Sequence, residues 1–114
     1  MSSIARKRRT TLKVRASVFA ALGAEARLAL IEKLANGAPQ SISRLAQDST
    51  LTRQAVTKHL RVLENAGVVH SVRVGRESLF ELRLEPFEEL QSYLERVSSQ
   101  WDDALARLKS FVEK

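Results

Sequence analysis

The sequence predicts a mainly α-helical domain that carries a single β-hairpin. Apolar residues recur at helical spacing along most of the chain, the pattern turns to β-type alternation only over residues 68–84, and helical spacing then returns up to the C-terminus. The 114 residues suit one domain with one hydrophobic core. No apolar run approaches the ~18 residues of a membrane span and no signal peptide is visible, so we expect a cytoplasmic protein that does not contact a membrane.

Charge is distributed unevenly along the chain. The net charge is +6, with 14 Lys and Arg against 5 Asp and Glu in residues 1–80, and 5 against 8 in residues 81–114. A basic body indicates an anionic partner, although charge that serves only solubility remains the alternative. The chain has no cysteine, which excludes disulfides and thiolate metal ligands.

The N-terminal third predicts a basic arm followed by two helices. Residues 1–13 include Arg6-Lys7-Arg8-Arg9 and show no apolar period, so we expect a flexible arm. Such an arm lies along DNA phosphates or enters a minor groove, or it makes no defined contact. Residues 14–22 and 24–35 then have apolar residues at helical spacing, and Asn36-Gly37-Ala38-Pro39 is a firm stop.

The middle of the chain predicts a helix-turn-helix. Ser41 is a plausible N-cap for a short helix over residues 42–48, and Thr52 is an N-cap for a second helix that ends before Gly67. One side of the second helix is an apolar stripe of Val56, Leu60 and Leu63. The other side carries cations, an amide and a hydroxyl with no acidic group, which are the groups that read base edges and bind phosphates. This pattern predicts a DNA recognition helix.

A hairpin and a long helix complete the predicted order of four helices, two strands and one helix. Residues 68–74 and 78–84 alternate apolar with polar around Gly75-Arg76, which predicts the hairpin of a winged helix-turn-helix. The loop has either these two residues or the four residues 74–77. Pro86 starts the last helix at a favourable first position, and the helix runs to about Val112. The predicted segments are therefore a basic arm (1–13), a DNA-binding core (14–85) and a dimerisation helix (86–114).

Apolar residues of the last helix recur at alternating spacings of three and four, which is a heptad seam. Such a seam predicts packing on a second copy of the chain, with the first helix contributing, while a helix that covers the chain's own core is the alternative. The predicted dimer interface consists of Val18, Leu90, Leu94, Val97, Trp101, Leu105 and Leu108.

The predicted partner of the core is double-stranded operator DNA. Gln54 and Thr57 are expected at base edges, since an amide can pair with adenine and a threonine methyl can meet thymine. The other candidates are expected to contact bases or phosphates. The complete predicted set is Ser41, Ser43, Thr52, Arg53, Gln54, Thr57, Lys58, Arg61, Arg73 and Arg76. Arg61 has the alternative of a salt bridge with Glu32 or Glu64. His59 lies on the flank of the helix, where we favour a local hydrogen bond over a base contact.

Metal binding and catalysis find no support in the sequence. His59 and His70 are the two histidines and lie in different predicted elements, so we expect no site for Zn, Ni or Cu. There is no nucleophile with a neighbouring base, no glycine-rich phosphate loop and no carboxylate pair in a cleft. We therefore expect no cofactor and no enzyme activity.

Residues 16–112 resemble the ArsR (arsenic-repressor-like) family of bacterial winged-helix repressors. The most specific match is Ala-Val-Thr-Lys-His-Leu-Arg-Val-Leu-Glu-Asn-Ala-Gly-Val-Val at residues 55–69, and residues 19–22, Arg27 and 73–80 also fit. The resemblance implies a homodimer that represses its own gene from a pseudo-palindromic operator. Metal-sensing members carry cysteines in the third helix or His and Asp sets in the last, and this chain resembles a cysteine-free branch without either. Ala24-Glu25-Ala26-Arg27 departs from the family's Asp-Pro-Thr-Arg, which loses a proline at a helix start.

Two other readings of the residues stay open. A winged helix can bind another protein without touching DNA. A DNA-binding regulator can also respond to a small-molecule or protein effector through a pocket, and the sequence predicts no particular effector.

Overall fold

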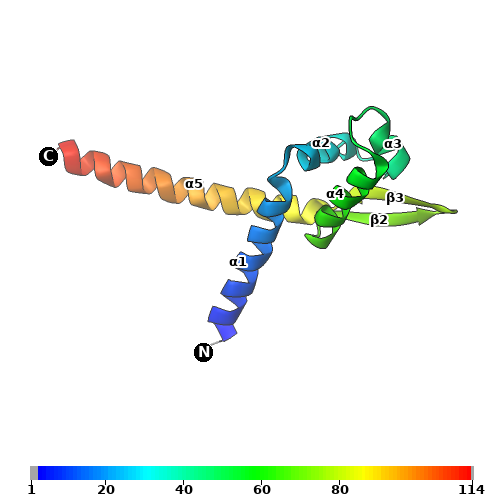
Figure 1. The fold of residues 1–114 in the computed structure, drawn as a ribbon. Coiled ribbons are helices and arrows are strands. Elements are labelled where there is room, and N and C mark those ends of the chain that lie inside the picture. The colour runs from blue at the N-terminus through cyan, green and yellow to red at the C-terminus, as the bar shows by residue number, and fades with distance from the viewer. Residues whose placement is uncertain (1–2, 114) are drawn as a thin grey trace. The chain divides into compact units, whose positions relative to one another are not determined.

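The computed structural model describes residues 3–113, which form helices and a small sheet and divide after Leu84 into two compact units. The elements in chain order are α1 (Ser3–Leu22), α2 (Glu25–Leu34), β1 (Gln40–Ser41), α3 (Ile42–Gln47), α4 (Arg53–Asn65), β2 (Val69–Val74), β3 (Glu77–Leu82) and α5 (Leu84–Glu113) (Figure 1). This order confirms the predicted mainly α-helical fold with a hairpin and adds the short strand β1. None of the helices within residues 3–113 is long and apolar enough to cross a membrane.

The core of the first unit is built from apolar residues of α1 to α4 and of the start of the hairpin. Its buried residues are Val18, Ala21, Leu30, Leu34, Leu45, Val56, Leu60, Leu63, Val68 and Val69. Val56, Leu60 and Leu63 are the predicted apolar stripe of α4. Burial of a Leu or Val side chain contributes about 1.5–3 kcal/mol, so this stripe fixes which face of α4 is turned away from solvent.

The first helix is longer than the sequence predicts. The expectation of a flexible arm is wrong for residues 3–13, which continue α1, while residues 1 and 2 lie outside the described part of the chain. The segment contains no Gly or Pro, and Ala, Arg, Lys and Leu are good helix formers. The Thr10 and Thr11 hydroxyls also donate to the carbonyls of Arg6 and Lys7, at 3.0 and 2.9 Å.

The recognition helix α4 has defined ends. The Thr52 hydroxyl accepts from the Ala55 N–H at 3.1 Å, which confirms the predicted N-cap. At the other end Gly67 has a φ of 79°, the Gly67 N–H donates to the Glu64 carbonyl and the Val68 N–H donates to the Leu63 carbonyl. These two bonds form a Schellman motif, whose hydrophobic contact is supplied by buried Val68 and Leu63.

Replacing Gly67 with Ala should destabilise the protein by about 1–2 kcal/mol, because an L-residue pays roughly that cost at a left-handed φ. The measurement is urea denaturation at fixed protein concentration. Gly23→Ala is the matched control, since Gly23 has no positive φ and its new Cβ would lie 3.4 Å from the carbonyl oxygens of Phe19 and Ala20. Equal losses for the two variants would contradict the role assigned to the Gly67 backbone.

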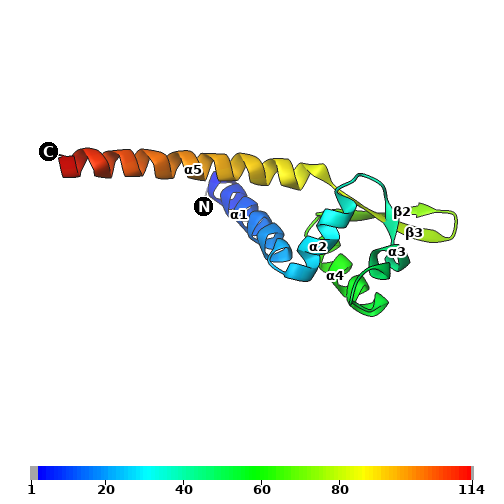
Figure 2. The ribbon, with the colours of Figure 1, turned by 90° about the horizontal axis from the view of Figure 1, so that it is seen from above.

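The hairpin turns through two residues. β2 and β3 pair antiparallel from Val69 opposite Leu82 to Val74 opposite Glu77, which leaves Gly75-Arg76 as the loop. Gly75 has a φ of 62° and Arg76 has no positive φ, as in a type II′ turn. β1 pairs with the other edge of β3 and gives the sheet order β1-β3-β2. The hairpin extends beyond α3 and α4 in both views (Figures 1 and 2).

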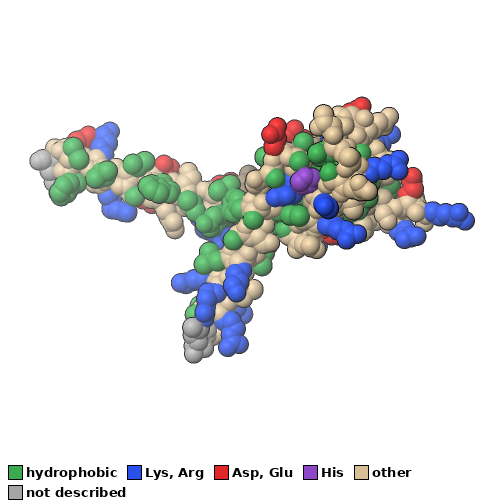
Figure 3. Space-filling model, in the orientation of Figure 1, with side chains coloured by type: hydrophobic (Ala, Val, Ile, Leu, Met, Phe, Trp, Pro, Cys, Tyr) green, Lys and Arg blue, Asp and Glu red, His purple; other side chains and the backbone are tan. Residues whose placement is uncertain are grey.

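The second unit is one helix with an exposed apolar seam. α5 has 30 residues, which corresponds to about 45 Å. It begins at Leu84, so Pro86 is the third residue and not the first, but this position is still in the first turn, where no intrahelical N–H bond is lost. Hydrophobic side chains gather along α5 in Figure 3. The seam is solvent-exposed at Leu94 (52%), Trp101 (64%), Leu105 (56%) and Leu108 (58%).

Two residues of the predicted dimer interface differ from the others. Val18 and Leu90 are buried within the single chain, at 4% and 6% exposure. Little of either side chain is therefore left for a second copy to cover. The remaining five predicted residues are exposed or half-buried, and their place in an interface stays a prediction.

Candidate nucleic-acid interface

The outward face of α4 is a line of polar and basic side chains. Gln54, Lys58 and Arg61 follow one another at spacings of four and three, opposite the buried stripe. All three are exposed, and within residues 3–113 none of their side chains forms a hydrogen bond or an ion pair. Asn65 continues the same line after another four residues and is also exposed. The helix therefore presents two uncompensated cations and two amides to solvent.

The structure shows which partners the side chains of Arg61 and His59 have on α4. Arg61 forms no salt bridge with Glu32 or Glu64 in the described part of the chain, and the Glu64 carboxylate accepts instead from the Ser71 hydroxyl at 3.3 Å. His59 is half-buried, and its Nδ1 lies 3.4 Å from Nη1 of Arg27. His59 thus forms a hydrogen bond within the protein, as predicted, but with a residue of α2 and not with one nearby in the sequence. Arg61 is left pointing to solvent.

Arg27 holds three helices together and was not singled out for this role from the sequence. Its Nε donates to the Ala21 carbonyl at 2.6 Å and its Nη2 donates to the Ala20 carbonyl at 3.3 Å, both in the last turn of α1. Because arginine only donates, His59 Nδ1 accepts from Nη1. The guanidinium also lies at the negative end of the α1 dipole. Arg27 of α2 therefore connects the end of α1 to the recognition helix.

Replacing Arg27 with Ala should reduce the free energy of unfolding by about 1.5–3 kcal/mol, the usual value of hydrogen bonds to a charged donor. Arg27→Lys keeps one donor and should lose less. Arg44→Ala is the control in the same urea denaturation series, because the exposed Arg44 side chain has no hydrogen-bond partner within residues 3–113. An unfolding free energy for Arg27→Ala that matches Arg44→Ala would contradict the connecting role.

The start of the helix-turn-helix brings several predicted DNA contacts together. A surface hollow of about 660 Å³ is lined by Ser41, Ser43, Arg44, Ala46, Gln47, Leu51 and Arg53. The Ser41 hydroxyl accepts from the Arg44 N–H at 3.2 Å, which confirms this N-cap. The hydroxyl hydrogens of Ser41 and Thr52 are not used by these caps, so each can donate to a phosphate oxygen.

Thr57 lies at the edge of the outward face. Its hydroxyl donates to the Arg53 carbonyl at 2.8 Å, so the hydroxyl hydrogen is engaged inside the helix. The side chain can still offer its methyl group and the lone pairs of its oxygen. This is compatible with the predicted contact to a thymine methyl and not with donation to a base.

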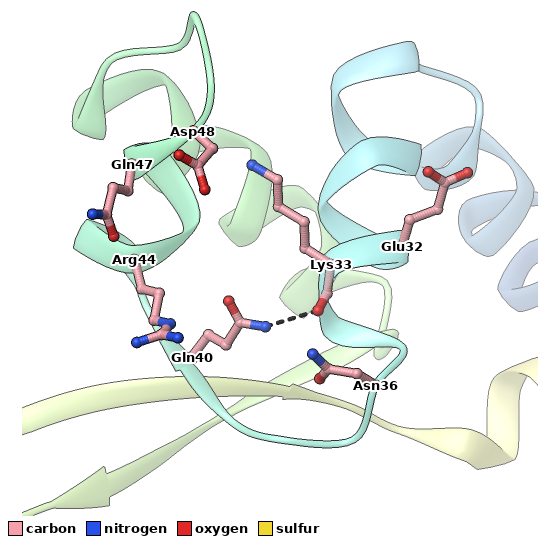
Figure 4. A pocket seen from close by; sticks show the side chains of 7 residues that line it. All are labelled: Glu32, Lys33, Asn36, Gln40, Arg44, Gln47 and Asp48. Carbon is pink, nitrogen blue, oxygen red and sulfur yellow. Dashed lines mark hydrogen bonds between the residues drawn. The ribbon is translucent and has the colours of Figure 1, made fainter.

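A second hollow lies between α2, β1 and α3 (Figure 4). It measures about 510 Å³ and is lined by Glu32, Lys33, Asn36, Gln40, Arg44, Gln47 and Asp48. Gln40 Nε2 donates to the Lys33 carbonyl at 2.7 Å, and Lys33 Nζ donates to the Leu45 carbonyl at 3.1 Å. These bonds hold α3 against the end of α2 and so set the position from which the turn to α4 begins.

The hairpin tip is basic, and a side-chain pair joins its two strands. Arg73 and Arg76 are exposed, and neither side chain has a hydrogen-bond partner in the described residues. Lys and Arg side chains are visible at this tip and around α4 on the same face in Figure 3. His70 and Glu81 are opposite each other in the register and bond at 2.5 Å between Nε2 and Oε1. Both histidines therefore have protein partners, and residues 3–113 contain no group of three or more His, Cys, Asp or Glu that could hold a metal.

Sequence reasoning missed two polar residues of this surface. Asn65 extends the line of Gln54, Lys58 and Arg61, and its spacing of four from Arg61 could have revealed it. Arg44 lines both hollows, but it is not among the DNA contacts predicted from the sequence. Together, the helix-turn-helix, its uncompensated basic face and the basic hairpin define a winged helix-turn-helix DNA-binding domain.

Comparisons with known proteins agree with this class. Residues 24–71 match the model of the "bacterial regulatory protein, arsR family". The chain is 34% identical over 80 residues to the uncharacterised HTH-type transcriptional regulator YuzN of Bacillus subtilis, covering 65% of this chain and 87% of that protein. It is similar to an ArsR-like transcriptional regulator from Rhodococcus sp. RHA1, with a TM-score of 0.81, 39% identity and coverage of 90% and 95% of the two chains.

A more distant structure shares the fold. It is the homodimeric winged helix-turn-helix DNA-binding domain of Mb0332 from Mycobacterium bovis, described as a possible ArsR-family regulator, with a TM-score of 0.69 and 21% identity over 88% of this chain and 89% of that one. This chain belongs to the ArsR family of bacterial regulatory proteins. This membership confirms the resemblance seen in the sequence. The protein is therefore a transcriptional regulator and not an enzyme.

Proposed function

We propose that this regulator is a homodimeric repressor that binds a pseudo-palindromic operator in the cytoplasm and controls its own gene. The observation that carries the DNA contact is the outward face of α4, where Gln54, Lys58 and Arg61 are exposed without internal partners. A helix held by three buried residues can enter a major groove without rearranging. Gln54 then contacts a base edge, and Lys58 and Arg61 contact bases or phosphates.

The remaining predicted contacts surround this helix. Ser41, Ser43, Thr52 and Arg53 bind phosphates at the start of the helix-turn-helix, and Thr57 meets a thymine methyl. Arg73 and Arg76 follow the wing into a minor groove or along its backbone. The exposure of these side chains, or half-exposure for Ser41 and Thr57, supports the assignment.

Dimerisation supplies a second copy of the recognition helix α4. The exposed seam of α5 at Leu94, Trp101, Leu105 and Leu108, with half-buried Val97, is an apolar surface that a second copy would cover. The homodimeric state of the Mb0332 domain supports the same assembly here. Two copies of α4 then enter successive major grooves, about 34 Å apart, so the operator has two half-sites related by a dyad.

Repression follows from occupancy, because a dimer bound across a promoter excludes RNA polymerase from the same DNA. The test is in vitro transcription from the DNA upstream of the regulator's own gene, with increasing amounts of purified protein and a promoter without the operator as control. We expect transcription to fall only on the operator promoter. Increased transcription would contradict repression, and equal transcription on both templates would contradict autoregulation. Adding candidate effectors to the same assay identifies any that release the protein.

A further inference from the structure

Three basic side chains form one stripe along the N-terminal half of α1. Arg6, Arg9 and Lys13 follow one another at spacings of three and four, so they share a face of the helix. Together with Thr10 they line a shallow groove of about 270 Å³. All three are exposed, and each is turned roughly 120° or more around the helix axis from buried Val18. We call these three residues the α1 basic stripe.

The charge of this segment is unfavourable for a helix on its own. No acidic residue precedes Glu25, and Arg6, Lys7, Arg8 and Arg9 lie in the first two turns of α1. The helix dipole favours anions there and disfavours cations, and like charges three and four residues apart repel. An anionic surface along the stripe would remove both penalties.

The helical form selects among anionic partners. An α-helix with side chains is about 10–12 Å wide and does not fit a minor groove of about 6 Å, so the minor-groove alternative for this segment is excluded. A membrane-surface helix needs a broad apolar face. The apolar side chains Ile4, Leu12 and Val14 share one side of α1, but Lys7, Arg8 and Arg15 lie among them, so that side is not a continuous apolar face. The phosphate backbone of duplex DNA remains as the partner that fits.

We infer that the α1 basic stripe binds the phosphate backbone of duplex DNA that flanks the half-site occupied by α4. This rests on the proposed DNA binding by α4. The stripe spans about 10 Å from Arg6 to Lys13 at 1.5 Å per residue, and phosphates of one strand are about 3.4 Å apart along the DNA axis. It can therefore reach about three phosphates. Figure 3 has Lys and Arg side chains of α1 on the same face as those around α4 and the hairpin tip.

The test compares two double variants that remove the same charge from α1. Arg6→Ala/Lys13→Ala removes two members of the stripe, whereas Lys7→Ala/Arg8→Ala removes two cations that point elsewhere, and alanine preserves the helix in both. Each protein is titrated, at several salt concentrations, with an operator duplex that ends at the outer edges of the two half-sites occupied by α4, and with one extended by about one helical turn on each side.

The stripe double variant should bind the extended duplex more weakly than wild type, by roughly fivefold per lost phosphate contact at 0.15 M salt, with a salt slope reduced by about 0.9 per contact. On the short duplex it should equal the control variant, and the control should follow wild type on both. Equal losses for the two double variants on the extended duplex would overturn the proposal. So would a wild type that binds both duplexes alike, or a stripe variant that loses binding to phosphatidylglycerol vesicles but not to DNA.

Failure of the proposed function itself looks different, because then the wild type binds neither duplex specifically. A second measurement uses the absence of cysteine. An iron chelate that cleaves DNA, attached at Thr10→Cys beside the stripe, should cut the DNA that flanks the half-site occupied by α4. The same reagent at Thr11→Cys is the control, since Thr11 makes the same type of hydrogen bond but lies about 100° further around α1. Equal cutting from both positions would contradict the assigned face.

Discussion

Replacing Trp101 with Glu should convert the dimer to monomers and lower operator affinity by roughly 10²–10⁴-fold. Trp101 is the largest side chain of the α5 seam and is 64% exposed in the single chain. A carboxylate in its place would be buried without a partner when two seams meet, which costs several kcal/mol. The monomer retains one α4 but loses the gain in effective concentration that a linked second half-site provides. Sedimentation equilibrium at micromolar concentration measures the assembly, and a gel shift measures the affinity.

Ser99→Glu is the matched control for this experiment. It adds the same charge two residues away, at an exposed position on the opposite side of α5. This variant should remain dimeric and bind DNA as wild type does. An intact dimer for Trp101→Glu would refute the seam as the interface, since the helical fold of both variants can be checked by circular dichroism.

Replacing both Lys58 and Arg61 with Ala should weaken operator binding by about 2–6 kcal/mol per half-site if each contacts a base, at about 1–3 kcal/mol per contact. If either residue contacts a phosphate instead, the salt slope should fall by about 0.9 for that contact in each protomer. The protein should keep its stability, because neither side chain has a partner within residues 3–113. Affinity is measured by titration at low and moderate salt.

Arg107→Ala/Lys109→Ala supplies the control, with the same loss of charge on exposed positions of α5. Its affinity and salt slope should stay close to those of wild type. If the two double variants lost affinity equally, the effect would come from overall charge and the outward face of α4 would not be the reading surface.

The helix-turn-helix was predictable because its signals are local. Ser41 and Thr52 are N-caps, Gly67 is the C′ glycine, and the stripe of Val56, Leu60 and Leu63 has only one way to face a core. Each of these features is decided within one or two turns of chain. The polar face of α4 followed from the same geometry.

Other features depend on contacts between distant segments. β1 has two residues and exists because Gln40 and Ser41 pair with Phe80 and Leu79 of the hairpin, some 40 positions later. Apolar residues occur on several sides of α2, so their spacing alone does not identify the buried face; packing buries Leu30 and leaves Leu28 47% exposed. The bonds of Arg27 to α1 and to His59 likewise required the three-dimensional arrangement.

The first helix was underestimated for a different reason. A hydrophobic period reveals a helix that buries one face, and residues 3–13 have no such period because most of their side chains face solvent. Intrinsic propensity alone carries helix through this stretch. The basic residues that suggested a flexible arm therefore lie on a helix.

Hydroxyl-radical footprinting of the purified protein on the DNA upstream of its own gene tests the dimeric DNA-binding account most directly. The predicted result is two protected segments related by a dyad, with centres one helical turn apart, and the loss of both with Lys58→Ala/Arg61→Ala at the same protein concentration. A single protected segment, or unchanged protection with that variant, would contradict the assignment of α4 and of the dimer.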